Sequence, residues 1–296
     1  MGAREEDERI GVGLALTLLG VATFSLTLPM TRVAVSALEP VTVALWRAIV
    51  AAAVAALVLL ARRARRPAGR EWGPIALCAL GTVFGFPLFT TLAMQSVSAS
   101  HGAVVVGLLP LATAVCGAAI GGERPSVAFW TAAVAGTALT LLFVLRQAEG
   151  GIAIGHAWLG LAVLAASVGY AYGGVAARGR PGWSVACWAL VIALPLLLPL
   201  ALVVPPPALS STPAALGAFL YLALCSQLLG FFAFYRGLAL AGIARGSQVQ
   251  LLQLFLTIGF AATLFGEAWD AEAVAFGALV VLCVALGTRA RIAGAR

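Results

Sequence analysis

The sequence contains no lysine and few charged residues of any kind. Asp, Glu, Lys and Arg make up 10% of its 296 residues, whereas hydrophobic residues make up 62%. Ordinary soluble domains have roughly 25% charged and about 45–50% apolar residues. So few charges cannot cover a soluble fold, and the composition indicates an integral membrane protein. The net charge of +7 comes from arginine alone, and in a membrane protein this excess marks cytoplasmic loops rather than a nucleic-acid partner.

Ten apolar segments predict membrane-spanning helices, for which about 20 residues are typical. The first five are Ile10–Met30, Val41–Ala61, Trp72–Leu92, Ser98–Gly121 and Ser126–Leu145, and the second five are Trp158–Ala177, Trp183–Val203, Ala214–Tyr235, Ser247–Phe265 and Ala273–Gly287. The segments between them are rich in Pro, Gly, Arg or acidic residues, which break helices or mark their ends. They are too short for a separate soluble domain. We therefore predict an all-α membrane protein with ten transmembrane helices.

The arginines divide unequally between the two ends of these expected helices. One end holds fifteen of them: Arg4, Arg9, Arg62, Arg63, Arg65, Arg66, Arg70, Arg124, Arg178, Arg180, Arg236, Arg245, Arg289, Arg291 and Arg296. The opposite end holds Arg32 and Arg146, and Arg47 lies within a span. Basic residues collect in cytoplasmic loops. We therefore expect a multi-pass protein of the cell inner membrane with cytoplasmic N- and C-termini.

An internal repeat appears when the sequence is shifted by 144 residues. Ala93–Arg124 then falls on Gly237–Ala268, and seven positions of this stretch coincide: Gly102/Gly246, Val105/Val249, Leu108/Leu252, Thr113/Thr257, Ala118/Ala262, Gly122/Gly266 and Glu123/Glu267. A repeat of five spans is odd, so the second copy enters the membrane in the inverted orientation. Residues 1–150 and 151–296 are thus expected to form two inverted five-helix repeats, an arrangement typical of transporters that bind substrate between the repeats.

The chain also resembles the EamA-type drug/metabolite transporters. Pro40 with Trp46-Arg47 is similar to an element of that family in its second span, and Ala93-Met94, Pro110 and Gly122-Glu123-Arg124 are similar to its signature over spans three to five. In the second copy Leu238 and Gly266-Glu267 match, whereas Leu254 stands where a proline is usual. The resemblance implies ten spans in two EamA repeats. It also implies export of amino acids, metabolites or drugs, and similar sequences include aromatic amino-acid exporters.

No acidic residue lies within an expected span. The acids all map to tails or span ends: Glu5, Glu6, Asp7, Glu8, Glu39, Glu71, Glu123, Glu149, Glu267, Asp270 and Glu272. A buried carboxylate is the usual ion site of a coupled transporter. This distribution favours a facilitator driven by the substrate gradient, or an unusual coupling group. With two histidines and no embedded acid, we expect no enzyme activity, no metal and no other cofactor.

Several polar residues are candidates for substrate binding. Arg47 either binds a substrate carboxylate or pairs with helix-end carbonyls or Glu39. His101 is either a pH-sensitive substrate contact or an interfacial histidine. Gln250 and Gln253 share one helix face with Ser247 and Thr257, and this face is expected to point into the bundle, either at substrate or at a neighbouring helix.

Aromatic residues and prolines complete the predicted site. Without a buried acid, a substrate ammonium would rely on ring faces, for which the candidates are Trp46, Phe86, Tyr170 and Trp188. Pro87 and Pro110 each remove a backbone hydrogen bond within a span and are candidate hinges. Glu123 and Glu267 end spans four and nine, and each is expected to accept N–H bonds at the start of the next helix, with gating as the alternative.

These features predict an exporter that works by alternating access. The expected substrate is an amino acid or a similar small zwitterionic metabolite in a central uncharged cavity. The alternatives are a multidrug or organic-cation exporter, or a membrane scaffold or lipid-handling protein without transport activity. The expected partners are the small-molecule substrate and the lipid bilayer, and the protein is expected to be a monomer or homodimer.

Overall fold

The computed structural model describes residues 3–121, 126–147, 154–177, 179–208, 210–241 and 249–289, and these residues form helices and loops without a β-strand. The first half contains α1 (Ala3–Ser25), α2 (Thr27–Val35), α3 (Pro40–Ala61), the short 3-10 turn η1 (Gly69–Glu71), α4 (Trp72–Ala79), η2 (Leu80–Gly85), α5 (Phe86–Ala93), α6 (Ala99–Val106), α7 (Leu109–Gly121) and α8 (Val127–Gln147). The second half contains α9 (Ile154–Ala177), α10 (Gly182–Ala201), α11 (Pro213–Leu220), η3 (Tyr221–Leu229), α12 (Gly230–Ala241), α14 (Leu252–Phe265) and α15 (Ala271–Arg289).

Six helical stretches in the described residues are long and apolar enough to cross a membrane: Ile10–Val35, Pro40–Ala61, Gly69–Ala93, Ile154–Ala177, Gly182–Ala201 and Pro213–Gly237. The other predicted spans correspond to shorter apolar helices at Ala99–Thr113, Trp130–Phe143, Leu252–Phe265 and Ala271–Cys283. The all-helical membrane fold is therefore confirmed. The count of ten spans in two inverted repeats stays a prediction, because helix length alone does not establish it.

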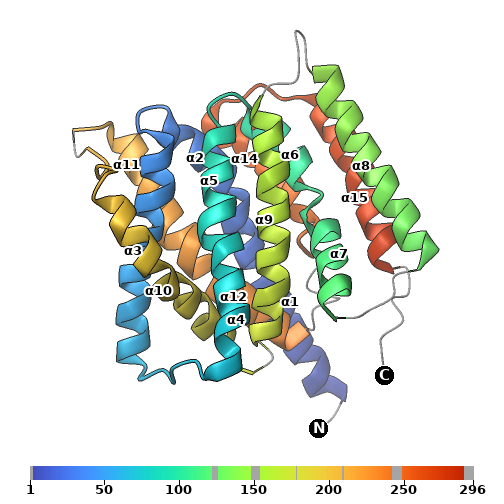
Figure 1. The fold of residues 1–296 in the computed structure, drawn as a ribbon. Coiled ribbons are helices and arrows are strands. Elements are labelled where there is room, and N and C mark those ends of the chain that lie inside the picture. Colours follow the sequence, from blue (N-terminus) through green and yellow to red (C-terminus); the bar gives the residue numbers. More distant parts are fainter. Residues whose placement is uncertain are drawn as a thin grey trace.

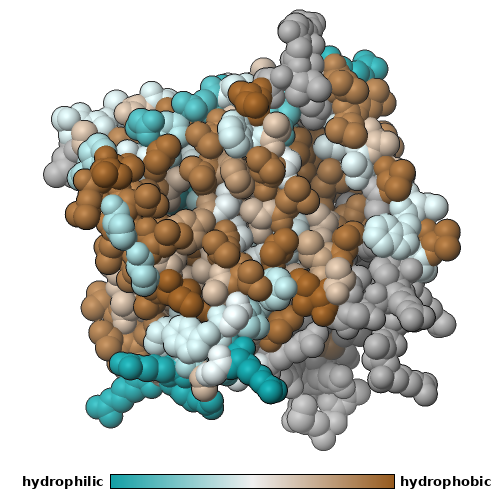
Figure 2. Space-filling view, in the orientation of Figure 1, coloured by the Kyte–Doolittle hydropathy of each residue, from teal (hydrophilic) through white to brown (hydrophobic). Residues whose placement is uncertain are grey.

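The helices form a bundle with hydrophilic ends and a hydrophobic middle. The start of α1 and the end of α15 lie at the same end, where the loop between α3 and α4 also lies (Figure 1). Hydrophilic residues gather at the two ends and a hydrophobic band separates them (Figure 2). Within such a band, large apolar side chains such as Leu60 (73% exposed) and Leu164 (60%) face outward, as they do in a protein solvated by lipid.

Two of the long helices are widened in the middle by π-helical turns. η2 separates α4 from α5, and η3 separates α11 from α12. Pro87 follows η2 directly, at the start of α5. Because proline lacks an N–H and its ring crowds the carbonyl four residues earlier, a local change in helical pitch accommodates it. η3 contains no proline, and its first residue lies 141 positions after that of η2.

Two other helices are interrupted rather than widened. α6 ends at Val106 and α7 begins at Leu109, with Pro110 in its first turn. Pro110 therefore lies at the start of a new helix. The sequence predicted instead one continuous span, Ser98–Gly121, with Pro110 as a hinge within it. Gln250 and Leu251 form a turn immediately before α14, at the position that the shift of 144 residues brings onto Val106 and Gly107. The two interruptions thus occur at matching places in the two halves of the chain.

Glycine allows one contact between helices to be closer than any side chain would permit. A Cβ atom on Gly81 of η2 would lie 2.2 Å from the Ala165 carbonyl oxygen, and one on Gly169 of α9 would lie 2.8 Å from the Thr82 side chain. Gly85 packs in the same way, since a Cβ atom on it would lie 2.5 Å from the Ala165 side chain. This contact fixes η2 against α9 in the middle of the bundle.

Candidate functional site

A cavity with about 370 Å³ of empty space lies where the interrupted and widened helices meet. We call it the central cavity. It is lined by Phe24, Thr27, Arg47, Thr82, Phe86, Ala166, Tyr170, Ser226, Gln227, Phe231 and Gln253. These residues come from both halves of the chain, and none of them is acidic.

Arg47 of α3 is the charged residue of the central cavity, and its side chain is 1% exposed. Its Nη2 donates to Gln227 Oε1 at 2.9 Å and to Ser226 Oγ at 3.5 Å. Nε and Nη1 have no hydrogen-bond partner in the described structure. Glu39, which the sequence offered as an ion-pair partner, instead accepts the backbone N–H groups of Val41 and Thr42 at the start of α3. Arg47 is therefore a buried cation without an anionic partner among the described residues.

The two π-helical turns meet at the side of this arginine. Gln227 lies in η3, and its Nε2 donates to the Thr82 carbonyl oxygen of η2 at 3.0 Å. A π turn shifts the backbone hydrogen-bond register, so a side chain from another helix can bond to a carbonyl inside it. Next to Gln227, the Ser226 hydroxyl lies 2.8 Å from that of Thr27. Arg47 is thus held by a polar network that connects α2, α3 and both widened helices.

Aromatic rings form part of the wall of the central cavity. Phe231 lies 4.8 Å from Phe24 and 6.0 Å from Tyr170, measured between ring centroids. Tyr170 also lies 6.3 Å from Phe234, and Phe86 lines the same space from α5. The cavity therefore offers one cationic polar face and one apolar aromatic face to a small molecule.

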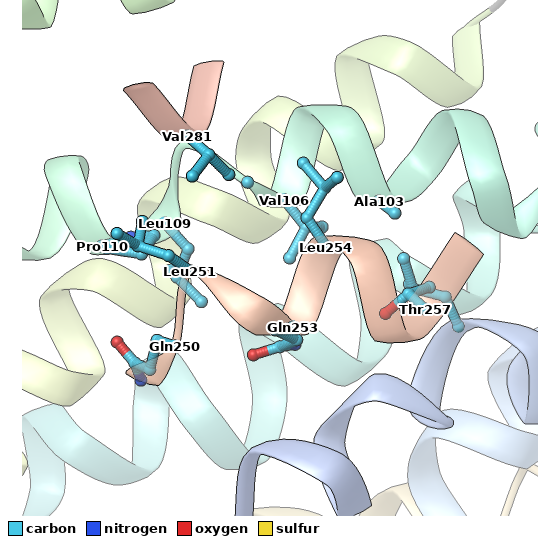
Figure 3. Close-up of a pocket in the computed structure, with 12 residues that line it drawn as sticks. Ala103, Val106, Leu109, Pro110, Gln250, Leu251, Gln253, Leu254, Thr257 and Val281 are labelled. Atoms are coloured by element: carbon cyan, nitrogen blue, oxygen red, sulfur yellow. The ribbon is translucent and has the colours of Figure 1, made fainter. Parts of the chain in front are cut away.

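A second cavity of about 390 Å³ lies beside the first and is built around the two helix interruptions. It is lined by Leu28, Ala103, Val106, Gly107, Leu109, Pro110, Gln250, Leu251, Gln253, Leu254, Thr257 and Val281. Figure 3 shows Gln250 and Gln253 on the α14 side and Leu109 and Pro110 on the α7 side of this space. Gln253 lines both cavities, so its amide lies at the junction between them.

A cluster of ion pairs and helix caps lies at the end of the bundle where α14 ends, which we call the Glu267 cluster. Glu267 accepts the backbone N–H groups of Ala99 (2.9 Å) and Ser100 (3.1 Å) at the start of α6. Arg32 Nε lies 3.7 Å from Glu267 and its Nη1 donates to the Val97 carbonyl at 2.7 Å. The prediction that Glu267 caps the next helix was wrong, because it caps α6, on the other half of the chain.

Asp270 performs the capping role that was expected of Glu267. Its Oδ1 accepts the Ala273 N–H at the start of α15, and its Oδ2 lies 2.8 Å from His101 Nε2. Partial burial raises the pKa of Asp270, but the hydrogen bonds from Ala273 and His101 outweigh it, so that the pKa lies below its ordinary value of 3.8. His101 thus belongs to the Glu267 cluster and lines neither cavity described above.

The predicted site residues fall into three groups. Arg47, Phe86, Tyr170 and Gln253 line the central cavity, whereas Gln250, Gln253 and Pro110 line the second cavity. The remaining candidates, His101, Trp46, Trp188 and Pro87, line neither. Trp46 donates its Nε1–H to the Val204 carbonyl at 3.1 Å, and the Trp188 ring packs edge-on against Trp72 at 5.9 Å.

Sequence reasoning missed the residues that hold Arg47. Ser226 and Gln227 lie in the predicted span Ala214–Tyr235, where a polar pair in an otherwise apolar run was a usable signal. Thr27 and Thr82 carried no such signal, because threonines recur throughout the helices and most bond back to their own backbone, as Thr82 does to Cys78. Phe24 and Phe231 are indistinguishable from packing aromatics by sequence.

Two comparisons decide the family. Residues 11–145 and 153–289 each match the model of the EamA-like transporter family. The chain belongs to this family. This EamA-like transporter is 41% identical over 273 residues to the uncharacterized transporter YdeK of Bacillus subtilis (strain 168), a match that covers 92% of this chain and 95% of that protein. The resemblance inferred from sequence is therefore confirmed, and the protein is a multi-pass membrane transporter.

The fold is also similar to that of a protein solved by crystallography. That structure has a TM-score of 0.61 and 23% sequence identity, over 95% of this chain and 98% of the other. Of the motifs that suggested an EamA-like transporter, Gly266-Glu267 has a clear structural role. Gly266 ends α14 in the left-handed conformation (φ 65°), which favours glycine, and the chain then turns so that Glu267 reaches α6. The matching Gly122-Glu123-Arg124 lies outside the described residues, as do Arg245 and Ser247.

Proposed function

We propose that this EamA-like transporter exports amino acids or similar small zwitterionic metabolites by alternating access through the central cavity. One observation carries the proposal: a buried arginine, held by both π-helical turns, faces an aromatic wall in a cavity built from both family-matched halves. Transporter sites combine such interrupted helices with a central position between repeats.

Alternating access needs two packings of similar energy, which inverted repeats provide. The widened segments η2 and η3 and the interruptions before α7 and α14 recur at matching positions in the two halves. These recurrences support ten spans in two inverted repeats, residues 1–150 and 151–296. The Glu267 cluster joins the two halves at one end of the bundle, so its bonds must break for the cavity to open there.

The driving force we propose is the substrate gradient itself. None of the residues that line the cavities described above is Asp or Glu. The described acids with placed side chains, Glu8, Glu39, Glu71, Glu267, Asp270 and Glu272, all lie near the ends of helices or in loops. Proton coupling through a buried carboxylate therefore has no candidate among these residues.

The same proposal includes an orientation in the membrane. The loop between α3 and α4 carries five arginines between Arg62 and Arg70, and it lies at the end of the bundle where α1 begins (Figure 1). The excess of basic residues in cytoplasmic loops supports an inner-membrane protein with both termini in the cytoplasm. In this orientation the Glu267 cluster faces the outside of the cell.

Transport by purified protein in liposomes tests the proposal. Labelled amino acids are expected to move down their gradient, into the liposomes or out of them, and this flux should not require a pH gradient. Absence of flux for every amino acid, beside an active control transporter, would contradict the proposed function. Flux of organic cations alone would indicate the multidrug alternative, and strict dependence on a proton gradient would contradict the facilitator mechanism.

A further inference from the structure

We propose that the central cavity recognises its substrate through the carboxylate group, and that the substrate class is small organic carboxylates with an apolar or aromatic body, whether or not they carry an α-ammonium group. This inference rests on the proposed function, which it makes more specific. It starts from Arg47, whose Nε and Nη1 lie buried in the cavity wall without a partner in the described structure.

The positive charge of Arg47 is permanent, because guanidinium does not deprotonate in proteins. A buried cation without an anion is unstable relative to a paired one. Three of its five N–H groups lie on Nε and Nη1, and a carboxylate oxygen is an anionic acceptor that either nitrogen can bind. A bound carboxylate therefore supplies the negative charge that the described protein groups around Arg47 lack.

The surrounding network holds the arginine in place for this purpose. Gln227 Oε1 accepts from Nη2 at 2.9 Å, while Gln227 Nε2 is bound to the Thr82 carbonyl at 3.0 Å. The amide is therefore fixed at both ends and cannot rotate away. A guanidinium that is held by one nitrogen presents the others in a defined direction, which reduces the ordering cost of binding an anion.

The cavity offers much less to an ammonium group. No carboxylate lines it, and several of its neutral acceptors already have protein partners. Thr82 O accepts from Gln227, Ser226 is paired with Thr27, and Gln227 Oε1 accepts from Arg47. The Gln253 amide and the ring faces remain as neutral groups that an ammonium could contact. The Arg47 charge also repels a cation.

The aromatic wall defines the rest of the substrate. Phe24, Phe86, Tyr170 and Phe231 line the cavity together with the polar network. A ring or a branched aliphatic group packs against such a surface, whereas a second charge would lose its water without compensation. A monocarboxylate with an apolar body fits both faces at once.

Three ligands that differ in one charged group test this inference. The three ligands share a phenyl ring. Phenylalanine carries a carboxylate and an ammonium group, 3-phenylpropanoate carries only the carboxylate, and phenethylamine carries only the amine. Binding is measured as the rise in melting temperature of the purified full-length protein in detergent. We expect 3-phenylpropanoate to bind within about threefold of phenylalanine, and phenethylamine to give no shift at concentrations about 100-fold higher. The inference would be overturned if phenethylamine binds, or if 3-phenylpropanoate binds more than threefold more weakly than phenylalanine. It would also be overturned if none of the three ligands shifts the melting temperature.

Variants locate the recognition at Arg47. Arg47→Met should abolish the shift with 3-phenylpropanoate, whereas Arg70→Met, which removes an exposed arginine, should preserve it. If Arg47→Met does not fold, Gln227→Glu replaces the 2.9 Å amide partner by a carboxylate that neutralises the arginine, and it should weaken binding at least about tenfold. Unchanged binding in Gln227→Glu would overturn the inference. Because binding is measured without transport, ligand binding without flux would count against the proposed function alone.

Discussion

Glu267 and Ser100 are joined by two hydrogen bonds although 167 residues separate them: Glu267 Oε2 accepts from the Ser100 backbone N–H at 3.1 Å and from its hydroxyl at 2.9 Å. Ser100 lies in the first turn of α6 in the first half of the chain, and Glu267 follows α14 in the second. One carboxylate therefore caps a helix and fastens the two halves of the transporter together at one end.

Replacing Glu267 should release this end of the bundle. Gln in its place cannot bond equally to Ala99, Ser100 and Arg32, because half of its amide is a donor. We expect Glu267→Gln to lower the free energy of unfolding by about 0.5–2 kcal/mol. We also expect it to speed the reaction of a cysteine at position 166, in the wall of the central cavity, with an impermeant thiol reagent added from the Glu267 side.

Ser98→Ala is the matched control for this variant. Ser98 caps the same helix, since its hydroxyl accepts the His101 N–H at 3.2 Å, but among the described residues its side chain makes no hydrogen bond to the second half of the chain. It should lower stability by a similar amount and leave the labelling of position 166 unchanged. If both variants speed the labelling equally, Glu267 acts only as a helix cap and not as a link between the halves.

Packing at the centre of the bundle gives a second prediction. Gly169→Ala places a methyl group 2.8 Å from the Thr82 side chain and 3.1 Å from the Cys78 carbonyl oxygen, so α9 must move away from η2. We expect a loss of about 1–3 kcal/mol in unfolding free energy and reduced transport, because Thr82 carries the bond to Gln227. Thermal unfolding and liposome flux measure the two effects.

Gly174→Ala tests whether the position or the residue type matters. Gly174 lies on the same helix, but nothing lies within 4 Å of where its Cβ would be. Alanine there should leave transport unchanged and should raise stability by up to about 1 kcal/mol, because alanine favours helix. Equal losses in the two variants would show that glycine matters in α9 for flexibility rather than for the contact with η2.

Composition and periodicity predict the helical membrane fold and the positions of its helices, because lipid requires long apolar segments with internally bonded backbones. They also predict that Arg47 and Gln253 face the interior, since both are costly in lipid. They do not predict η3, because a π turn without proline depends on packing against neighbouring helices. For the same reason Gln227, whose role comes from its bond to Thr82, was missed.

Aromatic residues show the limit of this reasoning most clearly. Trp46, Trp188, Phe86 and Tyr170 were equivalent candidates by sequence, yet two of them line the central cavity and two do not. Side-chain direction around a helix depends on how that helix is rotated against its neighbours, and an apolar helix buried on most sides carries no polar stripe that reveals the rotation. His101 lines neither cavity because its partner Asp270 comes from a loop that sequence spacing does not relate to it.

The Asp270 carboxylate gives a prediction on pH. Its pKa lies below the ordinary value of 3.8 in the folded protein, so its bonds to Ala273 and His101 stabilise the fold fully above that pH and are lost as the pH falls below it. The wild type should therefore be more stable than Asp270→Asn at pH 6, and the difference in melting temperature should shrink between pH 4 and pH 3. A difference that stays constant over this range would contradict the assigned role.

Orientation is tested by labelling two loops from one side of the membrane. In a protein whose five native cysteines are replaced, Arg66→Cys and Pro206→Cys place single thiols at exposed positions. Five predicted spans separate these positions, so they must lie on opposite sides of the membrane. An impermeant maleimide should label Pro206→Cys in intact spheroplasts and label Arg66→Cys only after permeabilisation, because the arginine-rich loop is retained in the cytoplasm. The reverse pattern would place the termini outside, and labelling of both from one side would show that the number of spans between them is even.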